Sequence, residues 1–183
     1  MFVVTITNGA ENTVIHSDGT DRISGGKIAK SIDARMIDRV DSFSFTIYPN
    51  NTGYDLLKPL TTAVRVYDES TDKDVFIGRV LKCPDSMNEQ GLICKTVTCE
   101  GRLGWLYDSV QPYVEYKMVG ISTVLSSFLS KHNSQVGADK RIELGQVTVT
   151  ASNNYTYTAN WDKTMDVIAD KLVGKFGGEI QLR

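Results

Sequence analysis

The chain contains 183 residues, of which 41% are hydrophobic and 23% charged, and its formal net charge is -2. This is the composition of an ordinary globular protein, and a chain of this length buries roughly two-thirds of its unfolded surface, enough for one sizeable core or two small ones. The chain lacks the overall basic excess of a dedicated nucleic-acid binder, although its summed charge does not exclude a local basic stripe. No apolar run approaches the ~20 residues of a membrane-spanning helix.

The N-terminus and the cysteines indicate a chain that folds in a reducing cytoplasm. Phe2–Thr7 has no basic region before it and is interrupted by threonines, so it is predicted to be a strand and not a signal peptide. Cys94 and Cys99 are five positions apart and would point to opposite faces of one continuous strand, which prevents their pairing. With Cys83, they are expected to be reduced and to pack like hydrophobic residues.

Residues 1–112 are predicted to form about seven short strands. The expected strands are Phe2–Thr7, Thr13–His16, Lys27–Met36, Ser42–Ile47, Ala63–Tyr67, Val75–Lys82, Leu92–Glu100 and Arg102–Leu106. Asn8-Gly9 and Gln90-Gly91 are expected to be turns, and 48–59 a connecting loop. Because no helical period occurs among them, these strands favour an antiparallel β-barrel or sandwich.

For three of these strands the sequence also predicts which side chains are buried or where another backbone comes close. Ser42–Ile47 alternates strictly, which places Phe43, Phe45 and Ile47 on one buried face. In Lys27–Met36, Ile28 and Ile32 are expected to share a face. The isolated Gly78 within Val75–Lys82 indicates a bulge or a close approach of another backbone.

Residues 113–183 are predicted to form a small α+β region with two helices. Ser122 is expected to cap the first helix, whose stripe is Ile121, Val124, Leu125, Phe128 and Leu129. Ile142–Thr150 and Tyr155–Thr158 are expected to be strands. The second helix is predicted over about 160–176, with a stripe of Trp161, Met165, Ile168 and Leu172, and Gly177-Gly178 is expected to end it.

The last residues, Glu179–Arg183, are expected to begin a further strand. A lone terminal strand leaves backbone donors and acceptors without partners. We therefore expect the natural polypeptide to continue beyond Arg183, so that the region from 113 is incomplete.

A search for catalytic chemistry predicts no catalytic, cofactor-binding or metal-binding residue. His16 and His132 are expected to be surface histidines, since no ligand cluster accompanies them. Gly25-Gly26-Lys27 lacks the Ser or Thr and the upstream glycine of a phosphate loop and is better explained as a turn. The acidic pairs Asp38/Asp41 and Asp72/Asp74 fall in expected loops, where solvated carboxylates are the default.

Several segments, in order from about Gly25 to the end, resemble one phage protein family. The segments are Tyr48–Tyr54, Leu60–Val66, Val75–Val80, Cys99–Pro112, His132-Asn133, Lys140–Gly145, Val147–Val149 and Leu172–Gly178. They are similar to the N-terminal region of the tail-associated lysin or prophage tail endopeptidase family of long-tailed phages that infect Gram-positive bacteria. Members of that family resemble the baseplate hub of contractile-tailed phages.

The resemblance implies a structural protein at the tail tip of the virion, assembled in the cytoplasm of the bacterial host. Such a hub closes the distal end of the tail tube, docks on the distal tail protein near the tape-measure protein, and lets DNA pass without specific binding. Family members are typically homotrimers. On this interpretation residues 1–112 are a β-barrel hub domain and 113–183 begin the following α+β part, with no catalysis and no membrane insertion in this segment.

Two other functions stay open. The chain is alternatively the N-terminal part of a wall-degrading tail peptidase whose catalytic domain lies downstream. It is otherwise a carbohydrate-binding module that contacts the host surface, for which stacking aromatics are needed. The candidate surface aromatics for a sugar or a protein interface are Tyr54, Tyr113, Tyr116, Tyr155 and Tyr157.

Overall fold

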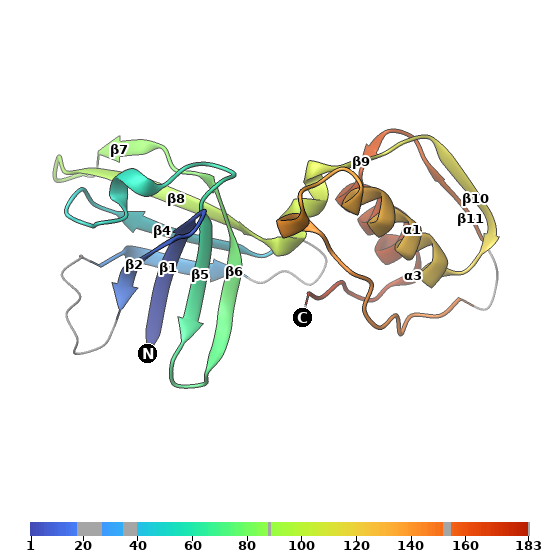
Figure 1. Ribbon diagram of the computed structural model, residues 1–183, viewed down its shortest axis with the longest axis horizontal. Helices are drawn as coiled ribbons and strands as arrows, with labels where there is room; N and C mark the ends of the chain where they lie inside the picture. The colour runs from blue at the N-terminus through green and yellow to red at the C-terminus, as the bar shows by residue number, and fades with distance from the viewer. Residues whose placement is uncertain (18–26, 35–39, 88, 152–154, 183) are drawn as a thin grey trace. The chain divides into compact units, whose positions relative to one another are not determined.

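The computed structural model describes residues 1–17, 27–34, 40–87, 89–151 and 155–182. The chain forms two compact units, Met1–Arg35 with Val40–Arg102 (unit 1) and Leu103–Arg183 (unit 2) (Figure 1). This boundary comes earlier than the predicted one after Pro112. The physical reason is that Leu106 is buried in the second core and Val110-Gln111 pairs with a strand of unit 2.

Unit 1 is one curled antiparallel sheet of eight strands, a half-barrel. The strands are β1 (Phe2–Asn8), β2 (Glu11–Ser17), β3 (Ala29–Ala34), β4 (Ser42–Ile47), β5 (Ala63–Asp68), β6 (Lys73–Lys82), β7 (Asp85–Met87) and β8 (Ile93–Gly101). Their order is β2-β1-β5-β6-β8-β4-β3, with β7 paired to β8 beyond the end of β6. A short 3-10 helix, η1 (Tyr54–Leu56), lies in the β4–β5 connection. The predicted mainly antiparallel β class is confirmed.

The core of unit 1 follows from the alternation of β4. Phe43, Phe45 and Ile47 are all buried, as predicted, and the Phe43 ring lies 5.5 Å from the rings of both Phe45 and Phe76. Fully burying each such side chain is worth about 1.5–3 kcal/mol. The predicted hairpin is present as well, because Gly9 adopts φ 62° between β1 and β2.

Gly78 allows β6 and β8 to pair closely. A Cβ atom at this position would overlap the backbone carbonyl of Glu100 on β8 and lie 2.7 Å from the Phe76 ring. The prediction of a close backbone approach at this glycine is confirmed.

Two expectations for unit 1 are wrong. Ile32 is 63% exposed, because a register shift between Ala29 and Ile32, with Lys30 at φ 50°, breaks the expected shared face with Ile28. Residues 102–106 are not a strand but part of the 3-10 helix η2 (Arg102–Asp108). The sequence analysis also missed β7. Gly25-Gly26, Met36, Asp38 and Arg183 lie outside the described residues.

Unit 2 combines helices with short strands. Its further elements are β9 (Val110–Gln111), β10 (Val114–Val119), α1 (Ile121–Asn133), η3 (Ala138–Lys140), β11 (Tyr155–Ala159), β12 (Asp162–Lys163), α2 (Thr164–Ile168), the π-helix η4 (Ala169–Val173) and α3 (Gly174–Phe176). β10 pairs with β11, and β9 with β12, both antiparallel. No helix of the described residues has the length and apolar character needed to cross a membrane.

The first helix of unit 2 starts two residues earlier than the predicted cap at Ser122 implies. Gly120, in an extended conformation, is the N-cap, and its carbonyl accepts from the amide of Val124 at 3.2 Å. Ser122 lies inside α1 and is therefore not the cap. The predicted stripe does face the core, with Ile121, Val124 and Phe128 buried.

The second helical run begins at Thr164, later than predicted. Residues 162 and 163 instead form β12, and Trp161 adopts φ 61° and is 70% exposed, so it does not belong to the buried stripe. Met165, Ile168 and Leu172 are buried as expected. Gly177, at φ 73°, ends the run and donates its amide to the Val173 carbonyl at 2.8 Å, as predicted.

Two segments predicted as strands are extended but do not join a ladder. Residues 142–150 run beside α1, where the Asn133 side chain bonds both the amide and the carbonyl of Ile142, each at 2.9 Å. Residues 179–182 likewise form no strand, although Ile180 and Leu182 pack partly buried against the second core. Side-chain amides and apolar contacts thus replace the predicted backbone pairing.

A side-chain amide also forms hydrogen bonds with the backbone of β9. Gln135, just after α1, accepts from the amide of Val110 at 3.0 Å and donates to its carbonyl at 2.8 Å. The polar groups of this short strand are thereby satisfied within unit 2.

Candidate functional site

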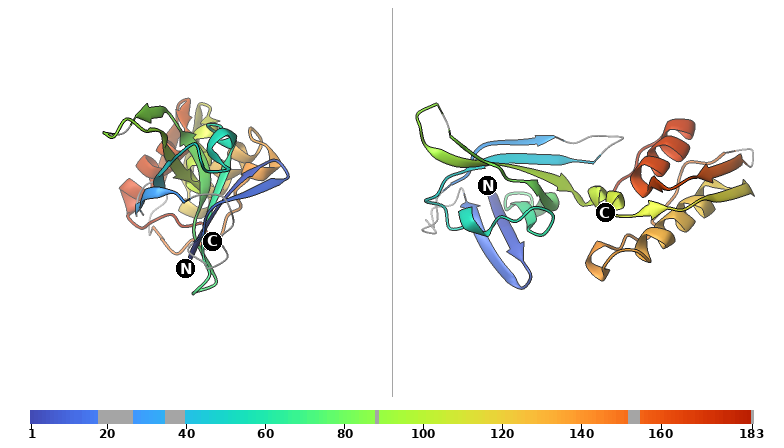
Figure 2. Two further views of the ribbon diagram at one scale, coloured as in Figure 1. Left: turned by 90° about the vertical axis from the view of Figure 1, so that its left-hand side faces the viewer. Right: turned by 90° about the horizontal axis from the view of Figure 1, so that it is seen from above.

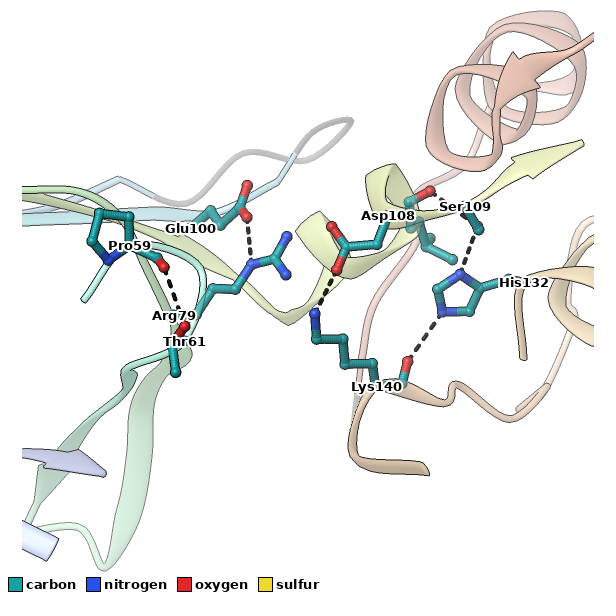
Figure 3. Close-up of polar contacts among 9 residues, drawn as sticks. Pro59, Thr61, Arg79, Glu100, Asp108, Ser109, His132 and Lys140 are labelled. Carbon is teal, nitrogen blue, oxygen red and sulfur yellow. Dashed lines mark hydrogen bonds and ion pairs between the residues drawn. The ribbon is translucent and has the colours of Figure 1, made fainter. Parts of the chain in front are cut away.

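The interior of unit 2 contains a polar cluster around His132, near the end of α1. His132, Ser109 and Thr164 have no exposed surface, and Gln111 is almost fully buried. The Ser109 hydroxyl lies 2.7 Å from His132 Nδ1, and His132 Nε2 lies 3.0 Å from the Lys140 carbonyl (Figure 3). His132 is therefore not the surface histidine predicted from the sequence.

The donors and acceptors of this cluster fit one arrangement. Because the Lys140 carbonyl can only accept, His132 Nε2 carries the proton, and Nδ1 accepts from Ser109. Thr164 Oγ1 then donates to Ser109 Oγ at 2.6 Å. Each buried hydroxyl donates once and accepts at least once, so the cluster is internally satisfied.

Gln111 connects the cluster to α1. Its Nε2 donates to Thr164 Oγ1 at 2.8 Å and to the Phe128 carbonyl at 3.0 Å. One continuous set of bonds therefore ties β9, α1, α2 and η3. Such a satisfied network fixes the relative positions of the elements that it joins.

The Ser109–His132 contact has the atoms of a nucleophile and a base but the surroundings of a packed core. Both side chains are closed to solvent, and His132 Nε2 is oriented by a backbone carbonyl. A substrate has no access to Ser109 Oγ in this arrangement. Nearby, Lys140 Nζ and Asp108 form an ion pair of 2.9 Å at the surface. The chemistry that the cluster supports is structural.

Unit 1 contains an ion pair between adjacent strands, in which Arg79 is buried and Glu100 half-buried. Arg79 on β6 and Glu100 on β8 are register partners, and Arg79 Nε lies 2.7 Å from Glu100 Oε1 (Figure 3). Removing one partner of such a pair leaves a buried charge without compensation, which costs more than the intact pair contributes. The pair therefore fixes register at the close approach of Gly78.

The cysteines are free thiols, with Cys94 and Cys99 buried and Cys83 half-buried. Burial raises the pKa of the Cys99 thiol to about 12, and burial also raises the pKa of Cys83. Thiols held protonated are poor nucleophiles and metal ligands. Among the described residues, His, Cys, Asp and Glu form no group of three that could hold a metal ion.

The five candidate tyrosines are not brought together. Tyr54 and Tyr157 are buried, which corrects their expected role as surface contacts; Tyr116 and Tyr155 are half-buried, and Tyr113 is exposed. The Tyr54 hydroxyl donates to Asp85 at 3.1 Å. Burial raises the pKa of Tyr54, and the bond to Asp85 raises it further. The Tyr116 hydroxyl lies 2.6 Å from Ser127 Oγ.

Tyr113 has an aromatic neighbour that the sequence analysis assigned to the core. Register pairs Gln111–Asp162 and Val114–Ala159 place Tyr113 opposite the Asn160-Trp161 corner. Tyr113 and Trp161 are 64% and 70% exposed. The break of the helical pattern at Trp161 could not be read from its spacing, because the residue fits the stripe of the second helix.

The acidic pair Asp72/Asp74 lies at the β5–β6 turn and is engaged in local contacts. Asp74 pairs with Arg65 at 2.6 Å, and Asp72 accepts from the Tyr67 hydroxyl. The Arg65 guanidinium lies over the Tyr67 ring at 4.8 Å. The two carboxylates therefore serve as turn and surface partners on this hairpin.

No protein-family profile matches the chain. No curated protein matches it either. Among solved structures, it is similar to the 43 kDa tail protein of prophage MuSo2 from Shewanella oneidensis, with TM-score 0.61 and 12% identity, over 97% of this chain and 49% of that chain. A tail protein from Neisseria meningitidis MC58 matches with TM-score 0.43 and 14% identity, over 70% of this chain and 33% of that one.

The chain thus spans about half the length of the MuSo2 tail protein. At 12% identity the likeness extends to the backbone fold, across both units, and does not extend to individual side chains. The chain has the fold of a solved prophage tail protein.

Proposed function

We propose that this protein is a structural component of a phage tail. The observation that carries the proposal is the fold match to the MuSo2 tail protein over 97% of the chain. The two interiors add support, because each is closed by packing: unit 1 has an apolar half-barrel core, and unit 2 has an apolar core with the buried His132 cluster. Rigid units of this kind suit assembly better than turnover.

The finer form of the proposal is a hub at the tail tip. In this form the chain self-assembles into a homotrimer, docks on the distal tail protein and lies next to the tape-measure protein, with DNA passing through its lumen. The ordered resemblance to tail-tip proteins supports this position. A net charge of -2 is compatible with DNA that slides without binding, since each neutralised phosphate would add salt-sensitive affinity.

The location can be tested in purified phage particles that carry this gene. Cryo-electron microscopy of tails, combined with antibody labelling of the chain, should place it at the distal end in a fixed, symmetric copy number. Absence of the chain from intact particles would overturn the structural role, and labelling along the whole tube would overturn the hub position alone.

We further propose that this segment carries no wall-degrading activity of its own. The Ser109–His132 contact has nucleophile–base geometry, but both side chains are closed to solvent. The purified chain should release no fragments from peptidoglycan. Turnover that disappears in Ser109→Ala or in a single Asp substitution would contradict this proposal and favour the peptidase alternative.

Carbohydrate binding is the second candidate function, favoured by the exposed Tyr113 and Trp161 corner. Exposed aromatic side chains offer stacking surfaces for sugar rings, although Tyr and Trp serve protein interfaces equally well. Glycan-array binding that is lost in Tyr113→Ala and Trp161→Ala, and kept in Tyr107→Ala, would support a sugar site.

A further inference from the structure

Unit 1 exposes apolar side chains at the end of the β7–β8 hairpin. This hairpin tip comprises Met87, Leu92 and Ile93, with Met87 68% and Ile93 55% exposed. Met87 and Ile93 are register partners, so they lie side by side across the ribbon. In the right-hand view of Figure 2, the green hairpin extends away from the other strands of unit 1.

A second exposed apolar surface of unit 1, the leucine patch, comprises Leu60 and Leu81. The Leu60 amide donates to the Val80 carbonyl at 2.7 Å, which holds Leu60 next to β6. Val80 is buried in the core, whereas Leu81 lies at the register shift between Val80 and Lys82 and is 41% exposed. Both leucines are exposed.

The charges around the two surfaces are opposite in sign. Glu89 lies in the turn of the hairpin tip, whereas Lys58 and Lys82 flank the leucine patch, and all three are exposed. Farther from the turn, Asp85 and Lys95 are register partners of opposite charge, so Glu89 sets the charge at the tip. Because the tip and the patch both stay exposed on one chain, a chain does not cover its own patch with its own tip. Their complementarity is available to another copy.

We infer that the hairpin tip of one copy seats on the leucine patch of a second copy. The contact has aliphatic side chains at its centre and opposite charges at its rim, the usual arrangement of a specific interface. It rests on the proposed structural role, for which it names a self-assembly surface. Since it joins two different surfaces, it is heterologous, and its repetition closes a ring or extends as a filament.

One such contact is small. A handful of aliphatic side chains covers far less than the ~800 Å² per partner of a standard stable interface. In a closed ring every copy makes two contacts, one through its hairpin tip and one through its leucine patch. The contact therefore predicts association that is weak for a pair of chains and strengthens when the ring closes.

Sedimentation velocity of the purified full chain over a wide concentration range tests the contact. Met87→Ser with Ile93→Thr, and separately Leu60→Ser with Leu81→Thr, should each weaken association roughly tenfold or more. Ile32→Thr is the matched control, because Ile32 is equally exposed on β3, outside both surfaces. Far-ultraviolet circular dichroism checks that every variant is folded.

Charge reversal distinguishes this contact from nonspecific hydrophobic association. Glu89→Lys and Lys58→Glu should each weaken association, and the double variant, or an equal mixture of the two single variants, should restore it. A wild-type chain that stays monomeric throughout, or tip and patch variants that associate like wild type, would overturn the inference. Either result would leave the tail role intact, since that role is tested by locating the chain in particles.

Discussion

The two units of this chain reach a stable interior by different means. Unit 1 is held by a curled sheet whose apolar side chains alternate, as in the Phe43, Phe45 and Ile47 series on β4. Unit 2 has short strands, helical turns of three kinds, and a buried polar cluster around His132. The first interior depends on a repeating local pattern. The second depends on contacts between residues far apart in the sequence, such as the Ser109–Thr164 bond.

The difference predicts different responses to substitution. In an apolar core, the cost of a change follows the volume that is removed. In a satisfied polar network, the cost follows the number of donors and acceptors left without partners. Hydrogen–deuterium exchange read by mass spectrometry separates the two units within one chain, since each supplies its own peptides.

Phe45→Ala should produce the largest effect. Phe45 is almost fully buried in the half-barrel and packs against Phe43, so truncation should lower the free energy of unfolding of unit 1 by about 3–5 kcal/mol. Urea unfolding monitored by exchange measures it. Ile32→Ala, on the exposed edge strand, should change stability by less than about 0.5 kcal/mol. A loss under about 1 kcal/mol for Phe45→Ala would contradict the apolar account of unit 1.

His132→Phe should produce the next largest effect, confined to unit 2. It keeps the ring volume but leaves the Ser109 hydroxyl and the Lys140 carbonyl without their partner, at about 1–3 kcal/mol each. A double-mutant cycle with Ser109→Ala should give a coupling of about 0.5–3 kcal/mol. Additive effects in that cycle would mean that unit 2, like unit 1, is held by packing alone.

Gly78→Ala should destabilise unit 1 by about 1–3 kcal/mol, because its Cβ would meet the Glu100 backbone and force β6 and β8 apart. Thermal unfolding measures the change. Gly145→Ala is the control: no atom lies within 4 Å of its added Cβ, so it should be nearly neutral. Equal effects of the two substitutions would show that the close strand approach is not what holds this register.

The smallest effect concerns Asp68, at the end of β5. Hydrogen bonds from the Ser70 hydroxyl and amide, together with Thr71 and the N-terminal amine, hold the pKa of its carboxyl well below the ordinary value. A lowered pKa in the folded state stabilises the fold above the unfolded pKa of about 3.9, and this contribution disappears as the pH falls through the lower folded value.

Asp68→Asn should therefore lower the unfolding temperature near neutral pH and flatten its decline in acid. Calorimetric scans across this pH range check the sign. Ser70→Ala, which removes one of the hydroxyl donors, should give an intermediate profile. A variant with the same acid decline as wild type would exclude Asp68 as the cause.

The structure of unit 1 could be predicted further from the sequence than that of unit 2, because unit 1 depends on a local pattern and unit 2 on contacts between distant residues. On β4, every second residue is apolar, and both the strand and its buried face were predicted. The hairpin at Gly9 and the stop at Gly177 were also predicted, because positive φ favours glycine. The prediction that Ile32 shares a face with Ile28 was wrong, because a register shift between Ala29 and Ile32 breaks the alternation of β3. Such a shift depends on the partner strand.

In unit 2, the failures are residues whose partners are distant. His132 continues the helical spacing of the α1 stripe, four residues after Phe128, but its partners Ser109 and Lys140 lie in other elements and could not be inferred from that spacing. Trp161 fits a helical stripe by spacing, yet the pairing of β12 with β9 places it at an exposed corner. Residues 142–150 have the alternation of a strand but join no ladder, and at Ile142 the backbone bonds go to the Asn133 side chain.

The Gln135 side chain bonds both polar backbone groups of Val110 and so closes this short stretch of strand edge. An open strand edge is a template on which a neighbouring polypeptide can add its own backbone. Here a primary amide presents the same donor and acceptor that an invading strand would present, and it does so without offering a further edge. At Val110 the strand edge is thus already terminated by a side chain of the same unit, so that a second polypeptide cannot extend the sheet from these two backbone groups.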